Sequence, residues 1–250
     1  MAGAQVVCSG PGGRALTERL YEQDAYRRDC PAVVAAVSDA GIVLDQTVFY
    51  AMGGGQPGDS GQLIDTRGGA VVIVDTRKGE GNDILHLPER GDHGLQVGDT
   101  VRARIDWEPR YRHMRMHTCL HLLCALVDAP VTGGNLGPDK GRLDFDLPEA
   151  TVDKADLTAR LNALVSADTA TALQWISEAE LDAQPELVKT MSVAPPRGSG
   201  QVRLLSIADV DLQPCGGTHV ARTGEIGRVR VSKIEKKSRL NRRIAVVFDD

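Results

Sequence analysis

The hydrophobic pattern changes near Trp107, and this change constrains the fold more than any other feature of the sequence. Before it, short stretches rich in Val and Ile alternate with glycine-rich turns, and we expect strands at residues 32–37, 41–44, 62–64, 71–74 and 101–105. Closely spaced strands with such turns are typical of a small barrel or sandwich. We therefore predict a β-rich domain over residues 17–107. Residues 1–16 are rich in glycine and small side chains, and we predict that they form a loose leader.

After Trp107 the chain is expected to mix helices with strands. Residues 110–127 lack glycine and proline and are apolar through their second half, which predicts a mostly buried helix that Pro109 can open. We also expect a loop at 133–138, a half-buried strand around Leu143 and Phe145, helices over 151–165 and within 177–189, and strands at 202–207, 228–234 and 243–248. Ser177 is expected to cap the last of these helices. The chain is thus predicted to be α+β, with an α+β domain over residues 108–250.

Histidine and cysteine side chains form two groups with the spacing of metal ligands. Three histidines follow at four-residue intervals on the predicted helix: His113, His117 and His121. Residues four apart share one helix face, so two of these imidazoles can reach one ion. Far along the chain, Gly-Gly-Thr separates Cys215 from His219, and a tight turn there can bring both side chains to one point.

Imidazole and thiolate ligands together suit Zn²⁺. Spacing alone leaves open which two helix histidines bind the ion. Cys124 lies three residues past His121 and is a rival ligand. With five scattered cysteines the chain does not suggest a disulfide framework, and reduced thiols are expected.

The distribution of charge leaves room for a nucleic-acid partner. The net charge of −5 argues against one, but residues 222–243 hold nine Lys and Arg against two Glu. A local basic segment can bind phosphates even on an acidic protein. From it we select Lys236, Lys237 and Arg239 as candidate substrate contacts; the alternative is a solvated strand face. No apolar run approaches the roughly 20 residues of a membrane span, so we expect a cytosolic protein with no membrane partner.

Several motifs occur together in this chain. Two contain the metal-ligand candidates, His117-Thr-Cys-Leu-His121 and Cys215-Gly-Gly-Thr-His219. A glycine-rich motif, Gly53-Gly-Gly-Gln-Pro-Gly-Asp-Ser-Gly61, precedes them, and Thr132–Asn135, Gly141–Phe145, Thr223–Gly227 and Arg242–Ile244 add shorter ones. In this order the motifs resemble those of the AlaX family of alanyl-tRNA editing proteins, which are free-standing relatives of the alanyl-tRNA synthetase editing domain. The glycine-rich motif resembles that of the medium-length and longer members.

The resemblance implies a metal site and a reaction. The implied ligands of one zinc ion per chain are His117, His121, Cys215 and His219, and His113 is excluded. The implied reaction is hydrolysis, in trans, of mischarged tRNA(Ala), with Ser-tRNA(Ala) as the main substrate and Gly-tRNA(Ala) as a second one. No obligate protein partner is evident. Four protein ligands are typical of structural zinc, so a catalytic and a structural role for the ion both stay open.

The remaining candidate residues concern the pocket. Thr118 is expected to position water or substrate, or else to bond its own helix backbone. Asn135 stands where the family often has Gln to line the acceptor pocket, and its reach is shorter by one methylene. Arg142, with Asp144, is expected either to build the pocket floor or to form a plain surface ion pair. A loop of three consecutive glycines is expected to contact the substrate and narrow the editing cleft: Gly53, Gly54 and Gly55.

Three other functions stay open at this point. One is a zinc-stapled RNA-binding module without catalysis, which predicts tRNA binding without ester cleavage. Another is a deacylase for a different mischarged tRNA, and the third is a metal-dependent hydrolase of a small ester or amide.

Overall fold

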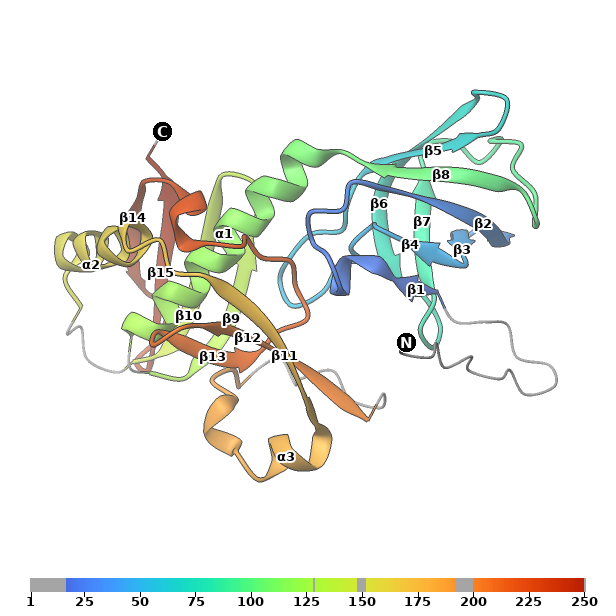
Figure 1. Cartoon of the computed structure of the whole chain (residues 1–250). Helices are drawn as coiled ribbons and strands as arrows, with labels where there is room; N and C mark the ends of the chain where they lie inside the picture. Colours follow the sequence, from blue (N-terminus) through green and yellow to red (C-terminus); the bar gives the residue numbers. More distant parts are fainter. Residues whose placement is uncertain (1–16, 128, 148–151, 192–199, 250) are drawn as a thin grey trace.

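The computed structural model describes residues 17–127, 129–147, 152–191 and 200–249. The predicted leader at residues 1–16 lies outside these ranges. Within them the chain combines a closed β-barrel with a second region of helices and sheets, and the long helix α1 (Trp107–Leu126) runs from one to the other (Figure 1). The predicted α+β class with an N-terminal barrel is confirmed.

The barrel consists of antiparallel strands in the order β2-β3-β7-β6-β5-β8. Their bounds are β2 (Asp29–Ser38), β3 (Gly41–Leu44), β5 (Gly61–Asp65), β6 (Ala70–Lys78), β7 (Ile84–Pro88) and β8 (Thr100–Ile105). Alternation decides which side chains enter the barrel: along β8 the three apolar side chains are buried, whereas Arg102 and Arg104 are exposed. A short parallel pair, β1 (Glu18–Arg19) with β4 (Gln46–Thr47), and the 3₁₀ turn η1 (Leu20–Glu22) lie beside it.

The second region is built around α1, which a single residue, Asp106, separates from the end of β8. One sheet has the order β14 (Val229–Lys236), β15 (Asn241–Phe248), β10 (Lys140–Asp146) and β9 (Val131–Leu136). A second sheet joins β11 (Thr171–Ser177), β12 (Gln201–Ile207) and β13 (Asp211–Pro214). Helix α2 (Lys154–Ser166) packs on β14.

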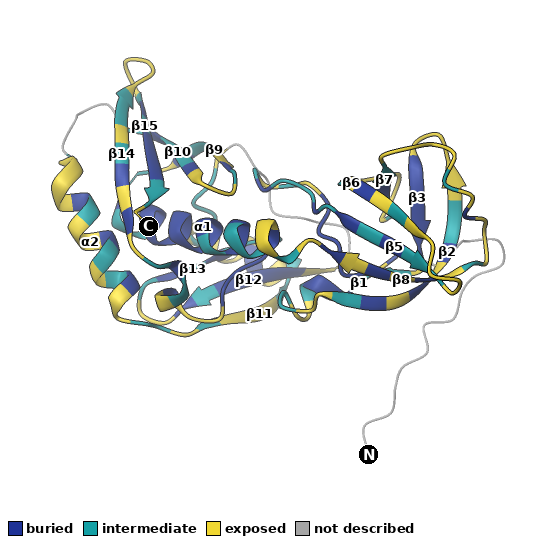
Figure 2. Cartoon of the chain, turned by 90° about the horizontal axis from the view of Figure 1, so that it is seen from above, coloured by how far each residue is buried: buried dark blue, intermediate teal, exposed yellow. Residues whose placement is uncertain are grey.

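Helix α1 lies at the centre of this region's hydrophobic core. Met114, Leu122 and Leu123 are fully buried and share one apolar cluster with Phe145 of β10 and Leu205 of β12. Figure 2 shows the helix buried along most of its length. Its residues therefore face protein on nearly every side, and polar side chains on it need partners inside the molecule.

Several elements differ from the prediction, since strands β7, β11 and β13 were not expected from the sequence. The expected loop at 133–138 is wrong, because residues 131–136 form β9, which pairs with β10 and holds a glycine, Gly134, where a Cβ would crowd Leu143. The short helix expected within 177–189 is confirmed as α3 (Glu178–Asp182), and a 3₁₀ turn η2 (Pro185–Leu187) follows it. Pro185 disfavours helical backbone in the residue before it. Ser177 does cap α3, in a capping box with Glu180.

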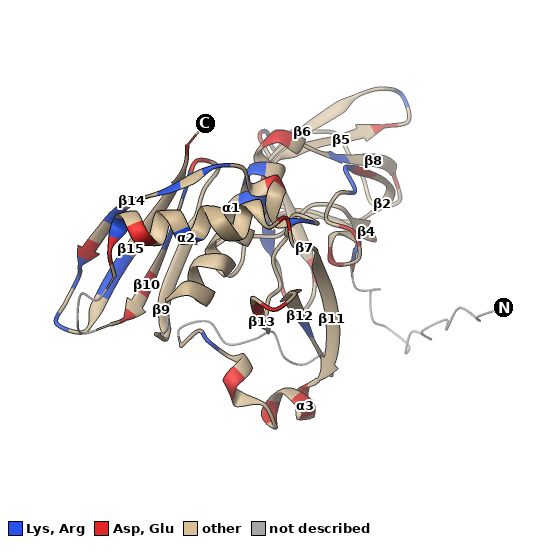
Figure 3. Cartoon of the chain, turned by 60° about the vertical axis from the view of Figure 1, so that its left-hand side comes forward, with Lys and Arg blue, Asp and Glu red and all other residues tan. Residues whose placement is uncertain are grey.

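Basic side chains gather on β14 and β15 (Figure 3). Lys236 is the last residue of β14, and Lys237 and Arg239 lie exposed in the turn that leads to β15. No helix in the described part of the chain has the length and apolar character needed to cross a membrane.

Candidate active site

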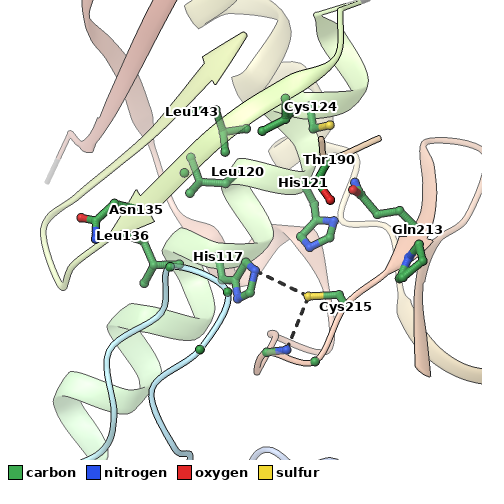
Figure 4. Close-up of a pocket in the computed structure, with 18 of the residues that line it drawn as sticks. His117, Leu120, His121, Cys124, Asn135, Leu136, Leu143, Thr190, Gln213 and Cys215 are labelled. Carbon is green, nitrogen blue, oxygen red and sulfur yellow. Dashed lines mark hydrogen bonds between the residues drawn. The ribbon is translucent and has the colours of Figure 1, made fainter. Parts of the chain in front are cut away.

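The two predicted ligand groups meet in the structure. The ligand atoms of His117, His121, Cys215 and His219 all lie within 4.8 Å of one another. The Cys215 Sγ lies 3.6 Å from His117 Nε2 (Figure 4). It also lies 3.2 Å from His219 Nε2. The group found among the described residues contains neither His113 nor the rival Cys124. Three imidazoles and one thiol at this spacing can hold a metal ion.

Two of the three rings are oriented by side chains distant in sequence. His117 Nδ1 lies 2.9 Å from the amide oxygen of Gln56, and His121 Nδ1 lies 2.9 Å from the carboxylate of Asp211. A carbonyl and a carboxylate oxygen can only accept, so each Nδ1 carries the hydrogen. The Nε2 lone pair of each ring is then left for the cluster, as in metal sites whose histidines donate to an outer partner.

The third ring, His219, is oriented by Thr118. The hydroxyl of Thr118 donates to the Met114 carbonyl at 2.9 Å. Its lone pairs face His219 Nδ1 at 3.3 Å and the backbone N–H of Val220 at 3.2 Å. Thr118 is fully buried and is not among the residues that line the pocket. Its hydroxyl therefore bonds the helix backbone, which is one of its two expected roles, and also accepts from a ring of the cluster.

Gln56 and Asp211, which accept hydrogen bonds from the first two rings, are themselves held in place. The Gln56 amide donates to the Thr218 hydroxyl at 2.8 Å and accepts from the Thr218 backbone N–H at 3.1 Å, which sets the direction of the amide. The Asp211 carboxylate accepts from Lys189 at 2.7 Å and from Gln213 at 2.6 Å. Each of these oxygens is thus held in place by further hydrogen bonds.

The turn that carries Cys215 depends on close backbone packing. Buried Arg203 donates to the carbonyl of Cys215 at 2.9 Å and also to that of Gly217. A Cβ at Gly217 would lie 2.2 Å from the His117 ring, so only glycine fits. Burial acts to raise the pKa of the Cys215 thiol, but the neighbouring histidine rings outweigh it, and the pKa lies well below its usual value. The thiolate is the form that binds metals.

A pocket of about 290 Å³ opens beside the cluster. His117, His121 and Cys215 line it from one side, and a loop of three glycines lines it from the barrel: Gly53, Gly54 and Gly55. The loop is joined to β9, because the Gly55 carbonyl accepts from the Leu136 N–H at 3.0 Å. The expected glycine loop therefore forms one wall of the pocket.

Two of these glycines occupy backbone conformations that favour glycine. Gly55 has φ +82°, and a Cβ there would lie 2.8 Å from the Gly134 carbonyl oxygen. Gly54 has φ +57°, but a Cβ on it would meet no atom within 4 Å. A side chain at Gly54 would therefore strain the backbone without a clash, whereas one at Gly55 would also push the loop away from β9.

The other candidate residues lie farther from the cluster. Asn135 is exposed at the edge of the pocket, with its side chain directed away from the ligands (Figure 4). Arg142 is absent from the pocket lining, and its guanidinium lies 2.9 Å from Asp144, which also accepts from Arg243. Of the two roles expected for Arg142, this arrangement corresponds to the ion pair.

Sequence comparisons place the chain among editing proteins. Two family models match it: one described as tRNA synthetases class II (A) at residues 24–109, and one described as the threonyl and alanyl tRNA synthetase second additional domain at residues 202–245. The alanyl-tRNA editing protein AlaX-M of Methanosarcina acetivorans is 36% identical over 92% of this chain and 98% of its own length. The AlaX-M protein of Saccharolobus solfataricus is 31% identical over 92% and 98%.

The chain belongs to the AlaX-M family of alanyl-tRNA editing proteins. The predicted family is confirmed, and so is the predicted enzyme class, since the members are named as editing proteins. An alanine–tRNA ligase of Saccharolobus islandicus is 34% identical over 88% of this chain, which corresponds to 25% of the ligase. This AlaX-M chain therefore matches one portion of a much longer synthetase.

Sequence reasoning missed the residues that orient this AlaX-M cluster. Gln56 was visible only as a polar residue inside the glycine-rich motif. Asp211 and Arg203 carry no local signal, because each acts on a partner that the fold brings near. A buried amide or carboxylate directed at a histidine is apparent only once the fold is known.

Proposed function

We propose that this AlaX-M protein hydrolyses Ser-tRNA(Ala), and Gly-tRNA(Ala) second, in trans, with one zinc ion bound by His117, His121, Cys215 and His219. The observation that carries the proposal is the orientation of the cluster. Three Nε2 atoms and one sulfur converge beside a pocket, and the Nδ1–H of each ring donates a hydrogen bond to a fixed acceptor oxygen. Such pre-orientation fits a metal site better than a set of core histidines.

The donor set fits zinc. Imidazole nitrogen and thiolate sulfur are its usual ligands, whereas calcium and magnesium prefer oxygen. Bound there, zinc would supply a Lewis acid that polarises an ester carbonyl. Gln56, Asp211 and Thr118 hold the rings, and Arg203 holds the turn that bears Cys215.

The pocket supports a small aminoacyl ester as substrate. An aminoacyl-tRNA carries an ester on its terminal ribose, and water can attack its carbonyl directly without a covalent enzyme intermediate. A cavity of about 290 Å³ bordered by the Gly53–Gly55 loop limits the size of the amino acid that can enter. Alanine would be rejected if buried polar groups of the pocket require the serine hydroxyl, because these groups would otherwise stay unpaired. Size alone cannot reject glycine.

Contact with the body of the tRNA is proposed for the basic hairpin of β14 and β15. Its exposed residues Lys236, Lys237 and Arg239 offer ammonium and guanidinium groups to phosphates. Phosphate contacts of this kind give affinity that falls steeply with salt.

One deacylation assay tests the proposal. Zinc-loaded protein is incubated with Ser-, Gly- and Ala-charged tRNA(Ala), with Cys215→Ala protein as the matched control. We expect release of serine far faster than of alanine, and loss of release in the variant. Binding of tRNA without any release of amino acid would favour the RNA-binding module, and faster release from another mischarged tRNA would reassign the substrate.

A further inference from the structure

The barrel contributes a cation to the pocket of the second region. Lys78, the last residue of β6, lines the same pocket as His117, His121 and Cys215. It lies close to Gly53, because a Cβ on that glycine would lie 3.3 Å from both Cε and Nζ of Lys78. The ammonium therefore lies beside the Gly53–Gly55 loop, on the barrel side of the pocket.

Lys78 differs from the other cations of the pocket in its partners. Arg19 lies 3.3 Å from the carboxylate of Glu22, and Lys189 lies 2.7 Å from that of Asp211. In the described part of the chain, Lys78 has no ion-pair or hydrogen-bond partner. Its ammonium thus has three donors available, and an anion can bind without displacing a carboxylate.

The proposed substrate places an anion near this position. When its ester carbonyl lies at the cluster, the terminal ribose lies at the pocket mouth. The next charged group along the nucleotide is the phosphate on the 5′ oxygen of the same ribose. An ammonium at the mouth is suited to such a phosphate as a point charge.

We propose that Lys78 binds the 5′ phosphate of the terminal nucleotide, so that the barrel helps to position the ester at the metal-ligand cluster. This inference rests on the proposed function. It gives the barrel a direct contact with substrate in addition to the loop that borders the pocket. The ligand class is a singly charged phosphodiester, which a lysine holds through charge-assisted hydrogen bonds.

Two minimal esters test the contact. One is 3′-O-seryl-adenosine, and the other is the same molecule with a methyl phosphate diester on its 5′ oxygen. The second adds one phosphodiester charge and no base. For the unmodified enzyme we expect kcat/KM to be on the order of tenfold higher with the phosphate, mainly through a lower KM.

The matched variants are Lys78→Gln, Lys78→Arg and Arg77→Gln. Lys78→Gln should abolish the preference for the phosphate and affect hydrolysis of plain seryl-adenosine far less than that of the phosphate ester, whereas Lys78→Arg should keep most of the preference. Arg77 is the neighbouring cation on β6, pairs with Asp75 at 2.7 Å and is absent from the pocket lining. Arg77→Gln removes the same charge and should keep the preference.

The outcomes separate this inference from the proposed function. If neither seryl ester is cleaved while the protein holds its metal, the proposed function fails. If both are cleaved at equal rates, or if Lys78→Gln keeps the preference, the phosphate contact is wrong and the proposed function stands. Equal loss of preference in Lys78→Gln and Arg77→Gln would mean that the positive charge of the barrel attracts the phosphate without a specific contact, which also overturns the assigned contact.

Discussion

Replacing Thr118 with valine tests how the cluster is held. Valine keeps the shape of threonine but removes the oxygen that faces His219 Nδ1 at 3.3 Å and Val220 N–H at 3.2 Å. Both donors are buried, so neither finds water. An unsatisfied buried donor costs about 1–3 kcal/mol. Loss of the hydrogen bond from the Val220 N–H lowers the stability of the fold. Loss of the hydrogen bond from His219 weakens metal binding, because that bond orients the ring and its Nε2.

The expected magnitudes follow from these two losses. We expect the free energy of unfolding to fall by roughly 1–3 kcal/mol, the cost of the unpaired Val220 N–H. The zinc dissociation constant should rise about 10–100-fold, as it does when an outer partner of a ligating histidine is removed. Thr118→Ser is the control, since it keeps the hydroxyl and loses one buried methyl group, which costs roughly 1 kcal/mol. Competition for zinc with a chromophoric chelator measures the zinc dissociation constants of Thr118→Val and Thr118→Ser for comparison.

Two results would refute this reasoning. If Thr118→Val holds zinc as tightly as Thr118→Ser, the hydroxyl does not orient His219. Alternatively, if the zinc-saturated valine variant loses its preference for seryl over glycyl esters, the hydroxyl reads the substrate. If the Thr118 hydroxyl only orients His219, the valine variant should keep its preference for seryl over glycyl esters but need a higher zinc concentration for full activity.

Three further predictions concern the metal, the acid stability and the tRNA. Cys215→Ala should lose most of the roughly one zinc expected per chain, whereas His113→Ala should keep it, measured by metal content after dialysis against a weak chelator; full retention in both would reject the ligand set. Burial lowers the pKa of His86 to about 4, so only the unfolded chain takes up a proton as pH falls from about 6.5, and stability should drop by roughly 3 kcal/mol by about pH 4. Chemical unfolding at several pH values checks this, and His86→Gln should flatten the decline. Neutralising three cations of the basic hairpin should raise KM for charged tRNA and reduce its salt dependence without affecting a minimal ester, and equal effects on both substrates would place the hairpin outside the tRNA path. The three cations to be neutralised are Lys236, Lys237 and Arg239.

Elements with a regular hydrophobic period could be predicted from the sequence. Strand β8 alternates apolar and basic side chains, and α2 has Leu157, Leu161 and Val165 on its buried face, so each was found within a few residues. The strands that were missed lack such a period. β7 is short and polar at its centre, where buried His86 bonds to Ile42 of the neighbouring strand β3 and to Thr47 of β4. β9 contains two glycines, whose propensity suggests a loop until a neighbouring strand supplies hydrogen bonds.

The same distinction applies to the site. The candidate ligands could be named because each pair lies on one short segment, a helix turn or a glycine turn, whose geometry follows from local sequence. The oriented acceptors could not, because Gln56 lies 61 residues from His117 and Asp211 lies 90 residues from His121. Only tertiary structure brings them together. Roles that depend on such distant pairs cannot be read from spacing.

The glycine-rich motif explains how the barrel and the metal-ligand cluster are held in a fixed position relative to each other. At one end its Gly55 carbonyl bonds to β9, and near the other end Asp59 pairs with Arg110 in the first turns of α1. Arg110 is fully buried and also donates to the carbonyls of Val48, at 2.7 Å, and Ala25, at 3.0 Å. A buried ion pair contributes little net stability, but its directional bonds favour one arrangement of the parts. Between these two anchors lies Gln56, which orients His117. The motif therefore joins the loop at the pocket, the barrel and the cluster in a single connection, so that a shift of the barrel would move both a pocket wall and a metal-ligand histidine.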